Sequence, residues 1–298
     1  MYRIRNKLAR AIHDWGCRSI LETPPLAIRR APLVICSMVS RRDLLMYLVA
    51  IKLFYRRIGE GRVCIIDDGT LDARCRAILT RHIREPEIIG IGDVDTAPCP
   101  RGGTWERLLH VLSLSSRDYV IQLDSDVVVR SELPEVVALY RENRCFTLGT
   151  RMGSRIVSAI EAATIAQRHD TTHVQIASEQ RLDRLESPHS KRYVRGCSGF
   201  AGYARGAISR SQAEDFSRAM QGLVGDLWLR WGSEQVASNF LIANSAGAEV
   251  LPVSKYVNYL PPFEIGQASL VHFLGEHRFR GAVYMRESRR LMRDLVPG

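Results

Sequence analysis

One short segment near the middle of the chain joins two apolar runs through a pair of acidic residues. Tyr119–Leu123 has the composition of a buried strand, Asp124 and Asp126 follow it, and the apolar residues 127–129 come next. Carboxylates beside a buried strand lose hydration, which costs free energy unless a cation or another partner compensates them. The pair predicts a site for a hard divalent cation, Mn²⁺ or Mg²⁺, rather than a simple helix cap, because it stands at the end of a strand.

Strand-like and helix-like segments alternate along the first half of the chain, and turn residues separate them. This alternation predicts an α/β fold with a mostly parallel central sheet flanked by helices. In open parallel sheets, ligands bind beyond the carboxyl ends of the strands, where the acidic pair is expected. We expect strands over residues 33–36, 63–66, 87–91 and 119–123, and helices over residues 43–57, 71–82 and 104–112.

Prolines and changes of composition mark the boundaries that we expect in the chain. A basic N-terminal extension would cover residues 1–31, and a single catalytic domain would cover residues 32–298. Within that domain, residues 152–195 are polar and break the alternation, which indicates an insertion over the acceptor side of the site. A basic C-terminal helix is expected over residues 281–296.

The net charge of +10 indicates a partner that is anionic, such as a phosphorylated substrate, an acidic bilayer or a nucleic acid. No apolar run reaches the roughly 20 residues of a membrane-spanning helix, so we expect a cytoplasmic protein. Basic residues at both ends could contact the inner face of the membrane, although solvated helix faces would explain them at least as well. These basic residues are Arg3, Arg5, Lys7 and Arg10, then Arg286, Arg289, Arg290 and Arg293. The seven scattered cysteines are expected to be reduced thiols in the core.

Four segments, in order, resemble the GT-A-fold nucleotide-sugar glycosyltransferases, and they are most similar to glycosyltransferase family 8. The acidic pair resembles the Asp-x-Asp motif of these enzymes, and residues 33–79 are similar to their first two strands and long helix. Residues 234–239, Glu-Gln-Val-Ala-Ser-Asn, look like the Asp-Gln-x-x-x-Asn start of a helix. Residues 271–278 are similar to the late His-x-x-Gly-x-x-Lys motif. The resemblance covers most of residues 33–280.

The resemblance implies a divalent cation held by Asp124, Asp126 and His272, bridging the diphosphate of the sugar donor. Gly275 would let backbone N–H groups approach a phosphate, and Arg278, in the place of the family's lysine, would neutralise the departing diphosphate. A histidine after an apolar strand is more often a packed core residue, but the glycine and the cationic residue that follow favour a ligand.

Glu234 and Gln235 correspond to the acidic and amide residues that face the donor sugar in family 8. Members of the family transfer the sugar with retention of configuration. Glutamate here replaces aspartate, so this carboxylate could bond the sugar, act as a nucleophile, or serve as the base of an inverting reaction. An acidic residue in the first turn that stabilises the helix dipole would also explain Glu234.

The remaining donor contacts are weaker assignments by position, because serine and aspartate are common turn residues. Ser198 and Gly199 stand where the family has Asn-Ser-Gly, with Cys197 in place of the asparagine. The other residues assigned to the donor are Ser37, Arg41, Asp67, Arg107 and Ser125.

The sequence therefore predicts a metal-dependent transferase that moves a hexose from a nucleotide diphosphate sugar, most simply a UDP-sugar, to a hydroxyl acceptor. The acceptor would be a saccharide or a lipid-linked saccharide. One alternative is a degenerate relative that binds the sugar nucleotide without turnover. Another is a basic nucleic-acid-binding protein, although the chain lacks an aromatic stacking strand, a helix-turn-helix pattern and a zinc spacing. A sugar-nucleotide pyrophosphorylase is disfavoured because residues 36–42 contain no glycine.

Overall fold

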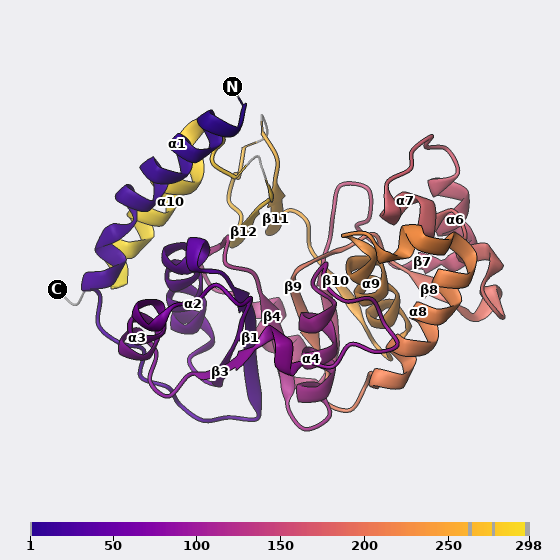
Figure 1. The fold of residues 1–298 in the computed structure, drawn as a ribbon, viewed down its shortest axis with the longest axis horizontal. Coiled ribbons are helices and arrows are strands. Elements are labelled where there is room, and N and C mark those ends of the chain that lie inside the picture. The colour runs from indigo at the N-terminus through magenta and orange to yellow at the C-terminus, as the bar shows by residue number, and fades with distance from the viewer. Residues whose placement is uncertain (1, 262–263, 276–277, 296–298) are drawn as a thin grey trace. The chain divides into compact units, whose positions relative to one another are not determined.

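The computed structural model describes residues 2–261, 264–275 and 278–295, without the side chains of residues 2–6 (Figure 1). The chain forms two compact units. Unit 1 comprises Met1–Gly90, Leu123–Val137 and Ser254–Gly298, and unit 2 comprises Ile91–Gln122 and Ala138–Val253. The expected division into an N-terminal extension and one catalytic domain stays a prediction.

Unit 1 contains three parallel strands of the main sheet in the order β1 (Leu33–Val39), β2 (Arg62–Asp67) and β3 (Glu87–Gly90). Helices α2 (Leu44–Ile58) and α3 (Ala73–His82) connect them. Parallel strands need such crossovers, and β1 and β2 are almost continuously apolar because helices cover this kind of sheet. The alternation predicted for this part of the chain is confirmed.

A second, three-stranded sheet in unit 1 has the order β11 (Tyr256–Tyr259), β12 (Leu270–Phe273) and β5 (Val127–Val129). β12 runs parallel to β11 and antiparallel to β5, and His272 lies opposite Val127. Residues 127–129 thus pair in this second sheet. The expectation that His272 follows an apolar strand needs correction, because β12 extends to Phe273 and His272 lies within it.

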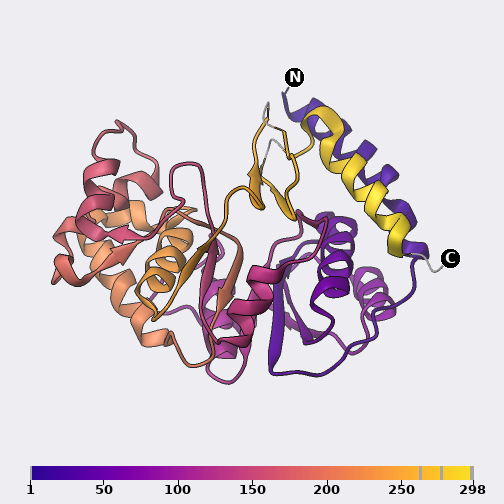
Figure 2. The ribbon, with the colours of Figure 1, turned by 180° about the vertical axis from the view of Figure 1, so that it is seen from behind.

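Two helices from opposite ends of the described chain, α1 (Tyr2–Gly16) and α10 (Val283–Met292), lie side by side in unit 1 (Figures 1 and 2). The buried His13 ring packs against Tyr284, with 4.3 Å between the ring centroids. α10 lies within the residues predicted to form a basic helix, of which residue 296 lies outside the described part.

Unit 2 contains the other strands of the main sheet, in the order β10-β6-β9-β4. β10 and β6 are parallel, whereas β6 and β9 are antiparallel. These strands are β4 (Tyr119–Leu123), β6 (Phe146–Leu148), β9 (Cys197–Tyr203) and β10 (Glu249–Leu251), and the helices around them are α4 (Trp105–Ser115), α8 (Arg210–Val224) and α9 (Ser233–Asn244). With seven strands in a mostly parallel main sheet and helices beside it, the predicted α/β fold class is confirmed.

The polar segment over residues 152–195, which was expected to be an insertion, is partly helical. Its elements are β7 (Val157–Ser158), α6 (Ala159–Ala166), α7 (Val174–Glu179) and β8 (Arg192–Tyr193), with β7 and β8 forming a short antiparallel pair. Before it, α5 (Pro134–Arg141) precedes β6 in the chain.

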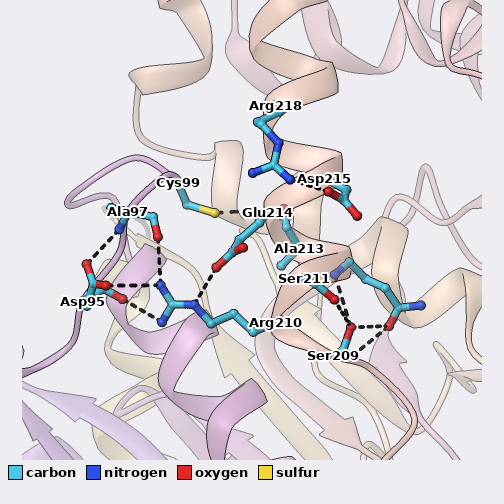
Figure 3. Close-up of polar contacts among 11 residues, drawn as sticks. Asp95, Ala97, Cys99, Ser209, Arg210, Ser211, Ala213, Glu214, Asp215 and Arg218 are labelled. Carbon is cyan, nitrogen blue, oxygen red and sulfur yellow. Dashed lines mark hydrogen bonds and ion pairs between the residues drawn. The ribbon is translucent and has the colours of Figure 1, made fainter.

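Arg210, at the start of α8, holds the loop that leads toward α4 (Figure 3). Its guanidinium donates hydrogen bonds to the carbonyl oxygens of Asp95 and Ala97, at 2.9 and 3.0 Å, and pairs with Glu214 at 2.7 Å. Ser209 caps the same helix. The Arg210 side chain thus provides hydrogen-bond donors for two backbone carbonyl groups of the loop before α4.

The described part of the chain, which includes all seven cysteines, contains no disulfide, and every cysteine is buried. The expectation of core thiols is therefore confirmed. None of the described helices has the length and apolar character that crossing a bilayer requires.

Candidate functional site

The acidic pair lies in the turn between β4 and β5. The side chain of Asp124 is 28% accessible, whereas that of Asp126 is 7% accessible. Backbone bonds fix the turn: Val127 N donates to Asp124 O at 3.3 Å, and Phe273 N donates to Asp126 O at 2.9 Å. The second bond attaches the turn directly to β12.

His272 faces both carboxylates from β12. Its Nε2 lies 3.1 Å from Asp126 Oδ1 and 3.8 Å from Asp124 Oδ2. Its Nδ1 lies 2.9 Å from Oδ1 of Asn258, the residue opposite it on β11. An Nδ1–H donated to this amide oxygen directs Nε2 toward the acidic pair, as in metal sites where a second residue orients the imidazole.

Arg278 contacts the carboxylate oxygen of Asp126 that does not face His272. Its Nη2 lies 3.1 Å from Asp126 Oδ2, and its Nε donates to Gly275 O at 2.8 Å. Burial alone would raise the pKa of the Asp126 carboxyl, but the charges of His272 and Arg278 outweigh burial and lower it. Asp126 therefore stays ionised inside the fold.

These donors fit a hard divalent cation. Ligand atoms of Asp124, Asp126 and His272 all lie within 4.8 Å of one another, and carboxylate oxygens with an imidazole nitrogen suit Mn²⁺ or Mg²⁺. Because Arg278 holds Oδ2 of Asp126, the guanidinium occupies part of the space around that carboxylate. A cation entering the site would compete with it for Asp126.

Two further residues of the predicted site lie beside this group. Apart from Gly275 and its chain neighbours, no atom of the described residues lies within 4 Å of where a Cβ of Gly275 would stand, and its φ of +42° favours glycine. The Ser125 carbonyl accepts a 3.3 Å hydrogen bond from the Tyr284 hydroxyl. Residues 276 and 277 of the late motif lie outside the described residues.

The three residues near the ends of β1 and β2 that were assigned to the nucleotide differ in burial and in their partners. Ser37 is buried within β1, because the strand continues to Val39 rather than ending before Ser37. Asp67 ends β2, and its Oδ1 accepts bonds from the backbone N–H groups of Gly69 and Leu71. Arg41 is exposed and pairs with Asp72. Of the three, Arg41 has the accessible side chain.

Glu234 lies in the first turn of α9 in unit 2, and its carboxylate is buried among polar side chains. Oε2 accepts a 2.8 Å hydrogen bond from Thr104 and a 3.3 Å one from Ser198. Arg107 Nη2 lies 3.6 Å from Oε1 of the same carboxylate and 3.4 Å from Ser198 Oγ. The structure thus brings three predicted residues of unit 2 together around one buried ion pair.

The other predicted residues of unit 2 lie next to this ion pair in sequence. Gln235, which follows Glu234 in the first turn of α9, is half-buried. Gly199 lies inside β9 next to Ser198. Unit 2 contains this cluster and unit 1 contains the acidic pair with His272.

Two residues that contact the candidate groups were not predicted from sequence. Asn258 orients His272, and Thr104 donates to Glu234. Asn258 stands at the strand position opposite His272, a signal that needs the pairing of β11 and β12 and therefore cannot be read from the sequence alone.

No protein-family model and no curated protein matches the chain in sequence. Among solved structures, that of an active-site mutant of LgtC is similar, with a TM-score of 0.52 and 12% identity, over 87% of this chain and 95% of that chain. This likeness shows the fold, which is that of the GT-A glycosyltransferases.

Two other similar structures have lower TM-scores. The galactosyltransferase LgtC in complex with donor and acceptor sugar analogs has a TM-score of 0.47 and 13% identity, over 87% of this chain and 95% of that chain. The WbbM bifunctional glycosyltransferase has a TM-score of 0.49 and 11% identity, over 87% of this chain. This chain spans only 51% of WbbM, about half of its length.

Proposed function

We propose that this protein is a metal-dependent glycosyltransferase that moves a hexose from a UDP-sugar to a hydroxyl group of a saccharide or lipid-linked saccharide. The observation that carries the proposal is the group Asp124, Asp126 and His272, whose ligand atoms lie within 4.8 Å of one another beside the strand ends. LgtC, whose fold this chain shares, is a galactosyltransferase, which supports the same conclusion.

A bound Mn²⁺ or Mg²⁺ would supply positive charge to the leaving diphosphate. Asp124, Asp126 and His272 would hold this ion, and Asn258 would keep the imidazole oriented. Arg278 would exchange Asp126 for the diphosphate, because a guanidinium binds phosphate as well as carboxylate. The space that the described residues leave beside Gly275 supports a phosphate contact at its backbone.

In unit 2 we assign the contact with the donor sugar to Gln235, whose side chain is half-buried. Glu234 would act as a positioning residue, holding the first turn of α9 through Thr104 and Arg107. A buried carboxylate lacks the access to an acceptor hydroxyl that the base of an inverting reaction needs, which supports retention of configuration. Ser198 and Gly199 would line the same region, and Arg41 would contact the nucleotide.

We place the protein in the cytoplasm, at the inner face of the membrane if its acceptor is lipid-linked. The net charge of +10 supports attraction to anionic lipid.

Calorimetric titration with UDP and Mn²⁺, followed by hydrolysis of a panel of UDP-sugars, tests the proposal. We expect UDP to bind only when Mn²⁺ is present, and Asp126→Ala to lower hydrolysis roughly 100-fold or more. Asp215→Ala, which removes a surface aspartate of α8, is the matched control and should leave hydrolysis unchanged. Equal rates in wild type and Asp126→Ala would contradict the mechanism.

A second candidate function is sugar-nucleotide binding without turnover. It is favoured by Cys197, which stands where family members have an asparagine, and by the contact of Arg278 with Asp126. Mn²⁺-dependent UDP binding with no hydrolysis or transfer for any donor would select it. A gel shift with an oligonucleotide, in the absence of UDP binding, would instead favour the nucleic-acid alternative.

A further inference from the structure

We propose that α1 is a membrane-docking helix, whose side chains Leu8, Ile12 and Trp15 enter the interface of an anionic bilayer while arginines of α10 contact the lipid headgroups. The inference deepens the proposed function by assigning a surface to its membrane partner, and it is tested by a measurement that requires no sugar transfer.

The apolar residues of α1 form one exposed row. Leu8, Ile12 and Trp15 are 62%, 48% and 74% exposed, and their spacing of four and three residues places them on the same face of the helix. A tryptophan suits a lipid interface because its ring is apolar and its N–H can reach water or a headgroup. The row therefore has the composition of a helix that lies in the interface plane.

The opposite face of α1 is fixed to unit 1, so the row cannot turn inward. His13 is buried against Tyr284, and a Cβ on Gly16 would lie 2.7 Å from Met285 Sδ, which shows how closely α1 and α10 pack. Arg10 pairs with Asp43 at 3.0 Å. These contacts leave the apolar row as the face of α1 that a partner can reach.

Positive charge accompanies this row, and it favours an anionic partner. α10 lies beside α1 in both views of the molecule (Figures 1 and 2). The one acidic residue of α10, Glu287, is already paired with Arg130 and Arg290. The exposed basic residues on or next to these two helices are Lys7, Arg18, Arg286, Arg289, Arg290 and Arg293. Basic side chains near an anionic bilayer each add to the binding, and salt weakens their contribution.

A lipid surface explains more of these features than a nucleic acid does. Phosphate groups of a polynucleotide would engage the basic residues, but they would gain nothing from an exposed row of leucine, isoleucine and tryptophan. A bilayer with acidic headgroups accepts both kinds of side chain at adjacent depths. We therefore assign this surface to anionic lipid.

Vesicle flotation tests the assignment, using the full chain without nucleotide or Mn²⁺. Wild type should float with phosphatidylglycerol vesicles at low salt and much less with phosphatidylcholine vesicles. Leu8→Ser/Ile12→Ser/Trp15→Ser should weaken binding at least tenfold. The matched control is Leu229→Ser/Trp231→Ser, which removes exposed apolar side chains of unit 2, 52% and 70% exposed, and should bind like wild type.

A second set of variants for vesicle flotation reverses the charge of basic residues. Arg286→Glu/Arg293→Glu should also weaken binding about tenfold, whereas Arg184→Glu/Arg205→Glu, which reverses two exposed arginines of unit 2, should have a smaller effect. Loss of binding in both pairs to the same extent would mean that net charge alone acts, and would overturn the assignment to this surface.

Tryptophan fluorescence locates the contact without relying on a destabilising variant. Trp105 and Trp228 are fully buried, so in Trp231→Phe the exposed indole is that of Trp15. Its emission should shift to the blue when phosphatidylglycerol vesicles are added. No shift and no flotation, or binding to an oligonucleotide in place of vesicles, would overturn the proposal while leaving Mn²⁺-dependent UDP binding to be judged separately.

Discussion

Each unit of the molecule holds a carboxylate beside an arginine, and the two arrangements differ in how a ligand could enter them. In unit 1, Asp126 contacts Arg278 at 3.1 Å, next to the more accessible Asp124. In unit 2, Glu234 is enclosed with Arg107, at 3.6 Å, and its other oxygen accepts bonds from neighbouring hydroxyls. A carboxylate beside an arginine thus forms part of a group that a cation could enter in unit 1, and a closed pair that supports the fold in unit 2.

The largest expected effect is on stability, from breaking the closed pair. Glu234→Ala should lower the free energy of unfolding by about 3–5 kcal/mol, because it removes the carboxylate that lies 3.6 Å from the buried guanidinium of Arg107. Urea unfolding followed by circular dichroism measures this change. Glu234→Leu/Arg107→Met should recover much of the loss, since it removes both charges together.

Glu161 provides the matched control for this comparison. Like Glu234 it lies in the first turn of a helix of unit 2 and pairs with an arginine, but its partner Arg155 is exposed. Glu161→Ala should cost less than about 1 kcal/mol. Equal losses from Glu161→Ala and Glu234→Ala would remove the distinction between a closed and an accessible pair.

The next effect concerns the affinity of unit 1 for a cation. His272→Ala should weaken Mn²⁺ binding about 100-fold, because the site loses its nitrogen ligand, and Asn258→Ala should weaken it about tenfold through the orientation of that ring. Electron paramagnetic resonance of free Mn²⁺ measures both. If the two variants bind Mn²⁺ as wild type does, the ion does not occupy this group.

Arg278→Gln should change the affinity for Mn²⁺ less than His272→Ala does, and in the opposite direction. Removing the guanidinium leaves Asp126 Oδ2 to the cation, so binding of Mn²⁺ alone should become about threefold to tenfold tighter. Binding of UDP in the presence of Mn²⁺ should become weaker, because the partner of the diphosphate is lost. A parallel loss of both affinities would instead make Arg278 a purely structural support.

The fold could be predicted because its signals are local. Apolar runs such as residues 33–36 and 63–66 became parallel strands, and the helices between them follow from their periodicity. The pairing of Val127–Val129 with β12 could not be predicted, since the two segments are far apart in the sequence and no local pattern joins them.

The sequence predicted which residues belong to the candidate site, but not most of the contacts between them. Asp124 and Asp126 follow from the cost of placing carboxylates at the end of an apolar strand. The distance of His272 from them depends on how β12 pairs with β5, and the burial of Glu234 depends on Thr104 and Ser198, which are far away in sequence. Composition identifies a charged residue, but its partner and its exposure are set by tertiary packing.

The smallest effect is the pH dependence that Arg278 confers on unit 1. The folded-state pKa of Asp126 lies below its ordinary value of 3.8, because the charges of His272 and Arg278 outweigh burial. A depressed carboxyl pKa stabilises the fold above the unfolded pKa, and this contribution is lost as the pH falls through the folded pKa. In Arg278→Gln one of the two charges is missing, so the pKa of Asp126 rises and protonation begins at a higher pH. The stability difference between wild type and Arg278→Gln should therefore shrink in urea titrations as the pH falls from neutral into the acidic range where Asp126 becomes protonated. A difference that stays constant over this range would mean that the guanidinium acts through packing and not through the charge of Asp126.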